Sequence, residues 1–368
     1  MPLYPLYALL FADHGLSDAA ISALFALWSV TTLVLEVPSG AWADVTSRRR
    51  MLAASGVLST AAFTLWVLLP SAPVFALGFV LWGVGTALAS GTLEALAYDA
   101  LARWDATDRY ATLMGRVRAG YLGATLVATA LAAPLVAIGG YVLPGLVGAG
   151  ATLLSAALAL TLPEEARGPR SARSTVRAAL VAWWAMLRDG VGEVSRVALL
   201  RRAVVLTALL TGLMAVDEYL PLLAADHGAT PAATALALTA VGVAETACVT
   251  LAGRVARARG PVLGALLAGS AIAVGTGALL PLGPGFALIA AGWGVLQLLL
   301  VVVETRVQDA VVGEARATVT SMAGLGSEAV GLGVLAVVGT GSVWIALPAL
   351  IAGLTVPLLV LAVVVSRE

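Results

Sequence analysis

The basic residues of this chain stand in groups that alternate with pairs of apolar stretches. All 21 of them are arginines. The groups are residues 48–50, 103–118, 167–202, 254–259, 306–316 and 367. Between successive groups lie two apolar stretches, joined by a short segment without arginine. This alternation is what the positive-inside rule produces when helices cross a membrane outward and back in pairs.

The composition excludes a water-soluble globular protein. Hydrophobic residues make up 60% of the 368, charged residues 11%, and the mean hydropathy is +0.99. In lipid only helices or closed barrels satisfy their backbone hydrogen bonds. Runs such as 262–282 and 343–365 are apolar on all sides and near the roughly 20 residues that a spanning helix needs. They lack the alternation of a barrel strand.

We therefore expect an all-α membrane protein with twelve transmembrane helices in two pseudo-symmetric six-helix bundles. The predicted spans are residues 1–13, 20–40, 51–69, 74–97, 113–136, 142–162, 203–223, 232–252, 262–281, 286–305, 317–338 and 343–365. The first is short, which predicts a truncated first helix or a misassigned start. Both termini are expected on the cytoplasmic side of the cell membrane, a location that the arginine-only, alanine- and glycine-rich composition favours.

The polar segment 163–202 is predicted to separate an N-terminal bundle, residues 1–162, from a C-terminal bundle, residues 203–368. Apolar residues from Val176 to Val194 recur in it at helical spacing. This pattern predicts an amphipathic helix along the membrane interface. Its role is either that of a tether between the halves or a regulatory, lipid-sensing one.

The two halves are related in sequence. A shift of 213 residues places Ala12-Asp13-His14-Gly15 on Ala225-Asp226-His227-Gly228, and Gly40 on Gly253. Trp82-Gly83-Val84 in the fourth span also repeats as Trp293-Gly294-Val295 in the tenth. Parallel repeats of this kind are typical of a class of secondary transporters, in which the substrate binds between the halves.

A motif between the second and third spans identifies a family. It reads Gly40-Ala-Trp-Ala-Asp44-Val-Thr-Ser47-Arg48-Arg49-Arg50. It resembles the signature of the major facilitator superfamily, Gly-x-x-x-Asp-x-x-Gly-Arg-(Arg/Lys)-x, with Ser47 in place of the second glycine. The preceding Glu36-Val-Pro38-Ser39 is similar to the efflux branches of that superfamily. With the repeat and the predicted spans, the resemblance covers essentially the whole chain.

The motif predicts a gating latch at the arginine-bearing ends of the helices. Gly40 allows a close helix approach, and Asp44 suits the positive N-terminus of another helix. The resemblance implies that this is the eleventh helix, near Arg316. Arg48 and Arg49 are expected to pair with Glu94 and Asp99, which end the fourth span; the alternative is that the arginines only set topology. Arg257 stands at the equivalent of Asp44, so the latch is expected to be asymmetric.

Span five carries a weaker resemblance, to a glycine- and proline-rich antiporter motif. It rests on Gly120, Gly123, Ala133-Pro134 and Gly139-Gly140. Alanine replaces the glycine before Pro134, and four residues rather than two precede the glycine pair. The resemblance favours export, while glycine packing with a proline kink explains the same residues equally well.

Carboxylates at membrane depth are the candidate proton-coupling residues. Ionisable groups there are costly and default to functional hypotheses. The candidates are Asp217, Glu328, Glu245 and Glu218. No arginine is predicted deep enough to neutralise a central carboxylate, so these groups could bind and release protons near physiological pH. A structural hydrogen bond is the alternative for each of them.

Candidate substrate-cavity residues are Trp82, Trp293, Gln297 and Tyr121, which could bind an apolar or cationic solute. Ordinary packing or contact with lipid is the alternative for each tryptophan. Asp13, His14, Asp226 and His227 lie at predicted turns. A metal site there is conceivable, but a pair of helix termini explains them better, and we expect no metal.

The sequence thus predicts a monomeric secondary transporter that moves a small solute by alternating access, most simply as proton-coupled efflux of a drug or metabolite. The alternative is a proton-coupled uptake symporter. The expected partners are a small-molecule substrate, protons and the lipid bilayer, with no nucleic acid and no cofactor. ATP-driven pumping is excluded because no lysine and hence no P-loop occurs. An enzyme is not expected, since Cys248 is the one cysteine and no metal-ligand spacing is present.

Overall fold

The computed structural model describes residues 1–164, 181, 184, 185, 188, 191, 192, 194, 196, 198–310 and 315–367. The side chains of residues 37, 41, 44, 45, 199, 308–310 and 315–319 are outside that description. The amphipathic helix predicted between Val176 and Val194 falls largely outside the described residues.

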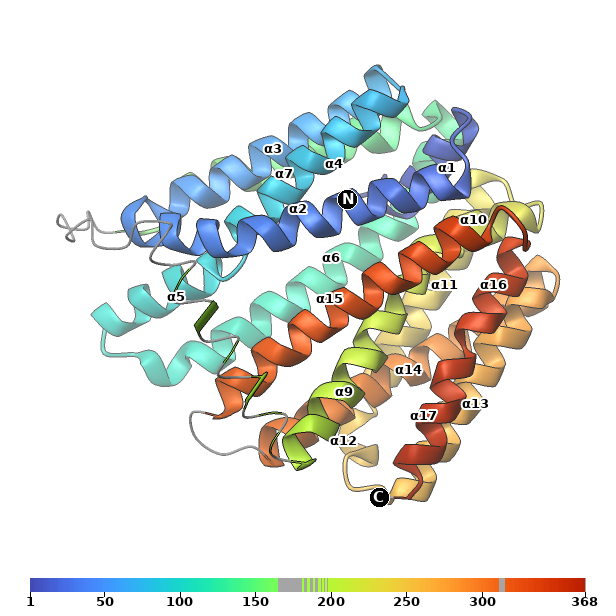
Figure 1. Cartoon of the computed structure of the whole chain (residues 1–368). Coiled ribbons are helices and arrows are strands. Elements are labelled where there is room, and N and C mark those ends of the chain that lie inside the picture. The colour runs from blue at the N-terminus through green and yellow to red at the C-terminus, as the bar shows by residue number, and fades with distance from the viewer. Residues whose placement is uncertain are drawn as a thin grey trace. The chain divides into compact units, whose positions relative to one another are not determined.

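All regular structure in the described chain is helical (Figure 1). In the N-terminal half the elements are η1 (Tyr4–Leu6), α1 (Tyr7–Asp13), α2 (Asp18–Val45), α3 (Arg48–Leu68), α4 (Ala72–Ala89), α5 (Thr92–Arg103), η2 (Thr107–Arg109), α6 (Tyr110–Gly139) and α7 (Val142–Leu160). In the C-terminal half they are α9 (Ala198–Leu213), η3 (Met214–Tyr219), α10 (Leu220–Asp226), α11 (Pro231–Val249), α12 (Ala252–Val255), α13 (Gly260–Leu279), α14 (Leu282–Ala310), α15 (Ala315–Gly341), α16 (Leu347–Leu354) and α17 (Val356–Val365).

Eleven helical segments of the described chain are long and apolar enough to cross a membrane. They match the predicted spans two to twelve in order. The predicted first span is not among them, because η1 and α1 together cover only Tyr4–Asp13. The multi-pass, all-helical class is therefore confirmed, while the full twelve-helix arrangement stays a prediction.

Contacts divide the chain into two units. Unit 1 comprises Met1–Gly15 and Leu24–Ala185, and unit 2 comprises Leu16–Ala23 and Met186–Glu368. The main division falls inside the segment 163–202 that was predicted to separate the halves. The first turns of α2 belong to unit 2, where the hydroxyl groups of Ser22 and Tyr219 form a buried hydrogen bond of 2.7 Å. Each unit is described by itself below.

Four of the predicted spans two to twelve are interrupted. The fourth ends as α4 at Ala89, and Gly91 with φ of +65° turns the chain into α5. The seventh changes to a 3-10 helix over Met214–Tyr219, just before Pro221, whose missing N–H weakens the helix there. The eighth breaks between α11 and α12, and the twelfth breaks at Thr355, before Pro357.

Small residues bring the helices of each unit together. In unit 1 a Cβ built on Gly56 of α3 would lie 2.8 Å from Ala156 Cβ of α7. The hydroxyls of Thr60 and Thr152 bond across the same pair of helices at 2.8 Å. In unit 2 a Cβ on Gly264 of α13 would lie 2.6 Å from the Ala362 carbonyl of α17. Such close approaches are how helices associate where lipid provides no hydrophobic driving force.

The sequence repeat extends to these contacts. A Cβ on Gly83 of α4 would lie 2.9 Å from Thr31 of α2, and one on Gly294 of α14 would lie 2.8 Å from the carbonyl of Ala244 of α11. The 213-residue shift places Thr31 on Ala244. It also places α1 on α10, and both helices end at a glycine of positive φ, Gly15 at +84° and Gly228 at +80°.

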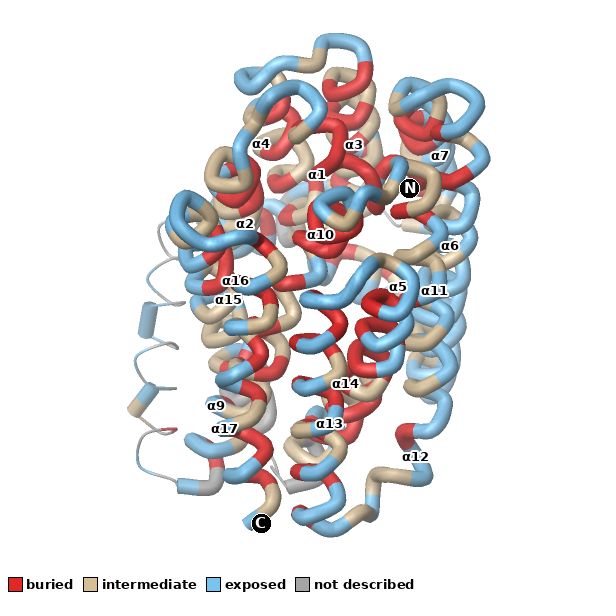
Figure 2. Tube along the Cα trace, turned by 90° about the vertical axis from the view of Figure 1, so that its right-hand side faces the viewer, coloured by how far each residue is buried: buried red, intermediate tan, exposed pale blue. Residues whose placement is uncertain are grey.

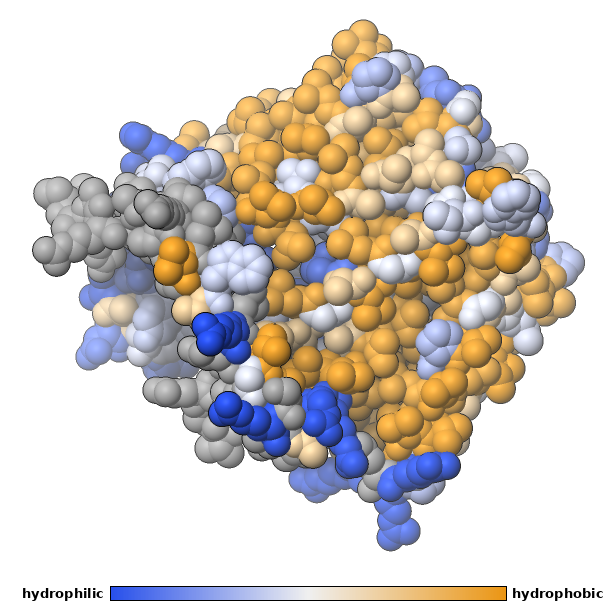
Figure 3. Space-filling model, in the orientation of Figure 1, coloured by the Kyte–Doolittle hydropathy of each residue, from blue (hydrophilic) through white to orange (hydrophobic). Residues whose placement is uncertain are grey.

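Burial follows the membrane environment (Figure 2). Large apolar side chains are exposed along the helices of both units, for example Val34 at 62%, Ile138 at 79% and Val360 at 62%. On the face shown in Figure 3 hydrophobic side chains predominate, and most of the strongly hydrophilic ones lie toward its margins. Such a surface would promote aggregation in water and is suited to lipid.

The glycine contacts predict that replacing glycine by alanine lowers the stability of unit 2 at some positions and not at others. We expect Gly294→Ala to lower the stability of the detergent-solubilised protein by about 1–3 kcal/mol, because the methyl group would overlap backbone atoms of α11. The matched control Gly269→Ala places its methyl group where no described atom lies within 4 Å, so it should be neutral or stabilising. Thermal unfolding of both variants checks this, and equal midpoints would contradict the packing.

Candidate functional site

Three positive charges stand at the start of α3, where the helix dipole makes them unfavourable. Arg48, Arg49 and Arg50 occupy its first turn, where the helix dipole is positive and cations are unfavourable. Ser47 is the N-cap, and its hydroxyl accepts a hydrogen bond from the Arg50 N–H at 3.3 Å. That hydroxyl satisfies one donor and adds no negative charge, so an anion is still needed.

Glu164, just after α7, supplies that anion. Its Oε1 accepts a hydrogen bond from the Arg48 backbone N–H at 2.7 Å, and its Oε2 accepts one from the Ser47 hydroxyl. The Nε of Arg49 lies 3.8 Å from Oε2. The Glu164 side chain is only 8% exposed, so these interactions are little screened. Glu164 therefore ties the end of α7 to the start of α3.

A second ion pair links α3 to α5. Nη1 of Arg48 lies 2.8 Å from Oδ2 of Asp99. Farther along α5, Nη2 of Arg103 donates to the Pro163 carbonyl at 3.4 Å. The structure thus brings together two of the predicted latch partners, Arg48 and Asp99. Glu94 is exposed at the start of α5 and is in neither of the two ion pairs found among the described residues.

The sequence did not single out Glu164. The signal was present, because Pro163-Glu164-Glu165 follows directly on a predicted span. Gly40 was expected to sit against a neighbouring helix, yet no described atom lies within 4 Å of a Cβ built on it. The side chains of Asp44 and Arg316 lie outside the described residues, so their predicted proximity stays a prediction.

In unit 2 the segment that corresponds to the start of α3 lies between α12 and α13, and hydrogen bonds rather than ion pairs hold it in place. Arg306 of α14 donates from Nε and Nη2 to the Ala256 carbonyl, at 3.1 and 2.9 Å, and from Nη2 to the Ala258 carbonyl. Ala256 is the C-cap of α12, and a cation is favourable at a helix C-terminus. In unit 1 the cations stand at the start of α3 and pair with carboxylates. In unit 2 the cation stands on α14 and the segment between α12 and α13 offers backbone oxygens.

In unit 2, two of the predicted coupling carboxylates act electrostatically on a third. Asp217 and Glu218 lie in η3, and Glu245 lies in α11. Asp217 experiences the charges of both Glu218 and Glu245. By surface area Asp217 is more accessible than the other two, which are half-buried, although protein surrounds it closely. Because neighbouring carboxylates cannot all ionise without repulsion, such a group can bind a proton or another cation.

The fourth candidate, Glu328, lies on another element. It is exposed on α15. The adjoining segment of α15 packs closely on α9, since a Cβ on Gly212 would lie 2.6 Å from the Ser327 carbonyl. The structure therefore places three of the four candidates together and the fourth on a neighbouring element.

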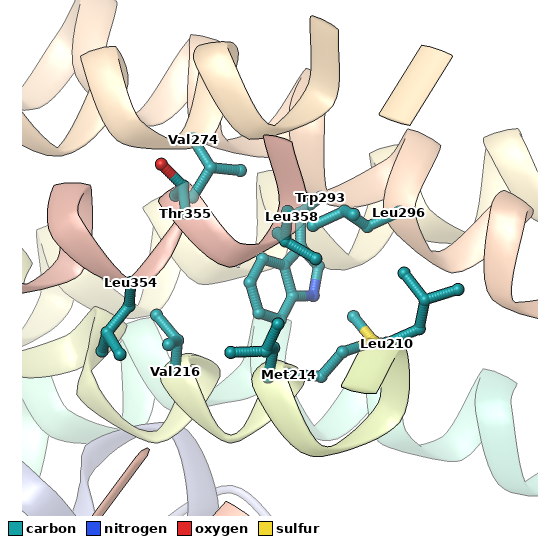
Figure 4. A pocket seen from close by; sticks show the side chains of 10 residues that line it. Leu210, Met214, Val216, Val274, Trp293, Leu296, Leu354, Thr355 and Leu358 are labelled. Atoms are coloured by element: carbon teal, nitrogen blue, oxygen red, sulfur yellow. The ribbon is translucent and has the colours of Figure 1, made fainter. Parts of the chain in front are cut away.

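The four predicted substrate-cavity residues differ in how far they are buried. Trp293 is 4% exposed and lies in the core of unit 2. Its indole borders a cavity of about 20 Å³, lined also by Met214, Leu296 and Thr355 (Figure 4), which has room for about one water molecule. Trp293 is thus a packing residue in this structure and not an exposed binding surface. Gln297 is half-buried, and Tyr121 is 64% exposed on α6.

The remaining candidate, Trp82, is half-buried on α4, at the edge of an aromatic cluster of unit 1. Its ring centroid lies 5.3 Å from that of Trp28 on α2 and 6.0 Å from that of Tyr4 on η1. Sequence patterns gave no reason to group these three residues.

The histidine turns are helix termini. His14 and His227 are the C-caps of α1 and α10, and the imidazole of His227 lies 3.0 Å from the Ala278 carbonyl. The Tyr141 hydroxyl donates to Asp13 at 2.6 Å. Burial and this hydrogen bond raise the pKa of Tyr141, so it remains a donor at physiological pH. Within the described residues, no three His, Cys, Asp or Glu side chains are placed to hold a metal ion.

The interactions at the start of α3 predict how much stability is lost when each of three carboxylates is neutralised. Glu164→Gln should lower stability by about 1–3 kcal/mol, because it leaves buried donors without their charged acceptor. Asp99→Asn should cost only about 0–1 kcal/mol, since Asp99 is half exposed. Glu94→Gln should be neutral. Denaturant unfolding of the three variants tests the order, and a larger loss for Glu94→Gln than for Glu164→Gln would contradict it.

The hydrogen bonds of Arg306 to two carbonyls predict that a lysine, which keeps only the positive charge, cannot replace its guanidinium group. Arg306→Lys should speed amide hydrogen exchange over residues 252–263, because an ammonium cannot reproduce the planar fork that binds two carbonyls. Arg257→Gln is the control, since it removes a charge from an exposed position of the same loop. Exchange in Arg306→Lys as slow as in the unaltered protein would show that the fork is dispensable.

Comparisons with known proteins agree with this architecture. The sequence profile of the Major Facilitator Superfamily matches residues 1–332. A sequence comparison with curated proteins gave no match.

Solved structures of transporters share the fold. The nucleoside transporter NupG superposes with a TM-score of 0.74 at 15% identity, covering 100% of this chain and 95% of that one. A bacterial homolog of the human lysosomal transporter Spinster gives 0.73 at 16%, covering 100% and 93%. A D-xylose-proton symporter gives 0.67 at 17%, covering 98% and 91%. These identities show the fold alone; because the profile spans most of the sequence, the chain belongs to the Major Facilitator Superfamily and is a membrane transporter rather than an enzyme.

Proposed function

We propose that this transporter is a proton-coupled exporter of a small solute, a drug or metabolite, that works by alternating access in the cell membrane. The observation that carries the proposal is the group formed by Asp217, Glu218 and Glu245. Three like charges at membrane depth are costly unless protons or a cationic solute compensate them. A carrier that exchanges one for the other needs such a group.

Asp217 is the best placed of the three to exchange protons. It is exposed, whereas its two neighbours are half-buried. It also lies in the 3-10 segment η3, which interrupts a spanning helix. Discontinuous helices near the midplane are where secondary transporters bind their substrates and coupling ions. We assign proton coupling to Asp217, with Glu245 and Glu218 adjusting its charge; Glu328 is a second coupling candidate on α15.

The arginine-bearing corner of unit 1 is proposed as part of the gate. Ion pairs to Asp99 and Glu164 hold the start of α3 to the ends of α5 and α7. A unit that moves as one body needs its helix ends fixed in this way. In the proposed orientation these ends face the cytoplasm, as the positive-inside rule requires, and the transporter acts as a monomer.

Uptake by symport is the second candidate. One of the structures with the same fold is a D-xylose-proton symporter, and the same carboxylates would serve either direction. The efflux proposal rests on the export-like residues at Glu36 to Ser39 and in α6.

The experiment uses everted membrane vesicles and compounds selected by a growth screen of expressing cells. Efflux coupling predicts solute entry into the vesicles when their interior is acidic, and loss of that entry when the gradient is collapsed. Asp217→Asn should abolish gradient-driven transport while leaving solute exchange in the absence of a gradient, because only the proton-binding group is removed. Asp105→Asn, which removes a carboxylate from a surface turn, is the control.

Transport indifferent to the gradient would remove proton coupling. Full gradient-driven transport in Asp217→Asn would remove the site. Accumulation of the compound by intact cells would establish the symporter.

A further inference from the structure

We infer that Tyr4, Trp28 and Trp82 form a binding surface for a planar heteroaromatic solute that carries a hydrogen-bond acceptor. This inference rests on the proposed transport function and adds the chemical class of the solute.

The three residues are the open edge of a larger aromatic cluster. In its interior the rings of Phe11, Phe63, Trp66 and Phe75 are fully buried, with neighbouring centroids 4.3–5.2 Å apart. At the edge, Tyr4 is 39% exposed, and Trp28 and Trp82 are half-buried. The cluster thus supplies a rigid base under three accessible rings.

All three edge residues lie at one depth. Tyr4 lies nine residues before Asp13, where α1 ends. Trp28 lies ten residues after Asp18, where α2 begins. Trp82 lies ten residues after Ala72, where α4 begins. At 1.5 Å per residue each ring lies about 15 Å from the same ends of the helices. That is half of a hydrocarbon core of about 30 Å, the depth at which transporters of this architecture hold their solutes.

Lipid is a poor explanation for this edge. Tyrosine and tryptophan favour the membrane interface, where their polar atoms reach water. At mid-depth lipid offers no hydrogen-bond partner, so contact with lipid does not explain why tyrosine and tryptophan rather than phenylalanine form this edge. Their partial exposure there is better explained by a surface that faces a solute path.

The indole of Trp28 indicates what the solute must offer. Its Nε1–H is buried and has no acceptor in the described part of the chain. An unsatisfied buried donor costs about 1–3 kcal/mol, which a solute acceptor would recover after a small movement of the ring. The indoles of Trp28 and Trp82 are tilted by 33° with ring centroids 5.3 Å apart, within the distance of about 4.5–7 Å at which aromatic rings attract one another.

The repeat adds an independent argument. The 213-residue shift places Tyr4 on Asp217, and both residues are exposed in 3-10 segments that continue into the matching helices α1 and α10. The position that carries the proposed proton site in unit 2 therefore carries an aromatic ring in unit 1.

The test compares two probes of the same shape, quinoline, which has an acceptor nitrogen, and naphthalene, which has none. Binding is measured by calorimetry on the full chain in lipid nanodiscs, with empty nanodiscs correcting for partition. The unaltered protein should prefer quinoline by about fivefold, the value of one hydrogen bond. Trp28→Phe should remove this preference, and Trp82→Leu should weaken both probes by about two- to tenfold through lost stacking.

The control is Trp344→Leu, which removes an indole that is 87% exposed and outside the cluster; it should bind both probes normally. Trp82→Tyr, which keeps a ring, should bind better than Trp82→Leu and guards against misfolding. Equal affinity of the unaltered protein for the two probes, or normal binding by Trp82→Leu, overturns the inference. Because no gradient is applied, a carrier without proton coupling can still bind quinoline, and a proton-coupled carrier that binds neither probe refutes this inference alone.

Discussion

Lipid removes the force that assembles most proteins, because its tails solvate leucine and valine as well as another helix does. What remains is close contact between backbones, and this chain obtains it with glycine. Gly56 and Gly264 seat the third and ninth spans on the sixth and twelfth, and Gly83 and Gly294 seat the fourth and tenth on the second and eighth. Polar interactions then need to act only at a few points, chiefly at the ends of helices.

The membrane-spanning segments could be predicted from the sequence because they depend on the composition of each segment by itself. Arginine placement and apolar run length predicted twelve spans, and eleven of them match, in order, helical segments of the described chain that are long and apolar enough to cross a membrane. The sequence failed where the outcome depends on which atoms meet. The breaks at Gly91 and in η3 came from single glycine and proline residues inside otherwise apolar runs, and hydropathy does not register them.

The candidate sites show the same limit. Arg48 and Asp99 could be grouped because the family motif supplies one and the end of the fourth span the other. Glu164 was missed because its role depends on where α7 ends relative to three arginines at the start of α3. The repeat relation between Trp82 and Trp293 predicts a shared helix position and not a shared exposure: Trp82 keeps an accessible edge, whereas Trp293 is enclosed by α9, η3, α13 and α17.

The two halves share their backbone plan and differ in their chemistry. The same transition from 3-10 to α-helix exposes Tyr4 in unit 1 and Asp217 in unit 2. The corresponding loops are held by ion pairs in unit 1 and by Arg306 on backbone carbonyls in unit 2. A symmetric pair of sites would bind solute and proton with the same groups and could not distinguish them. In the proposed mechanism, divergence at equivalent positions lets one half recognise an aromatic solute while the other exchanges charge.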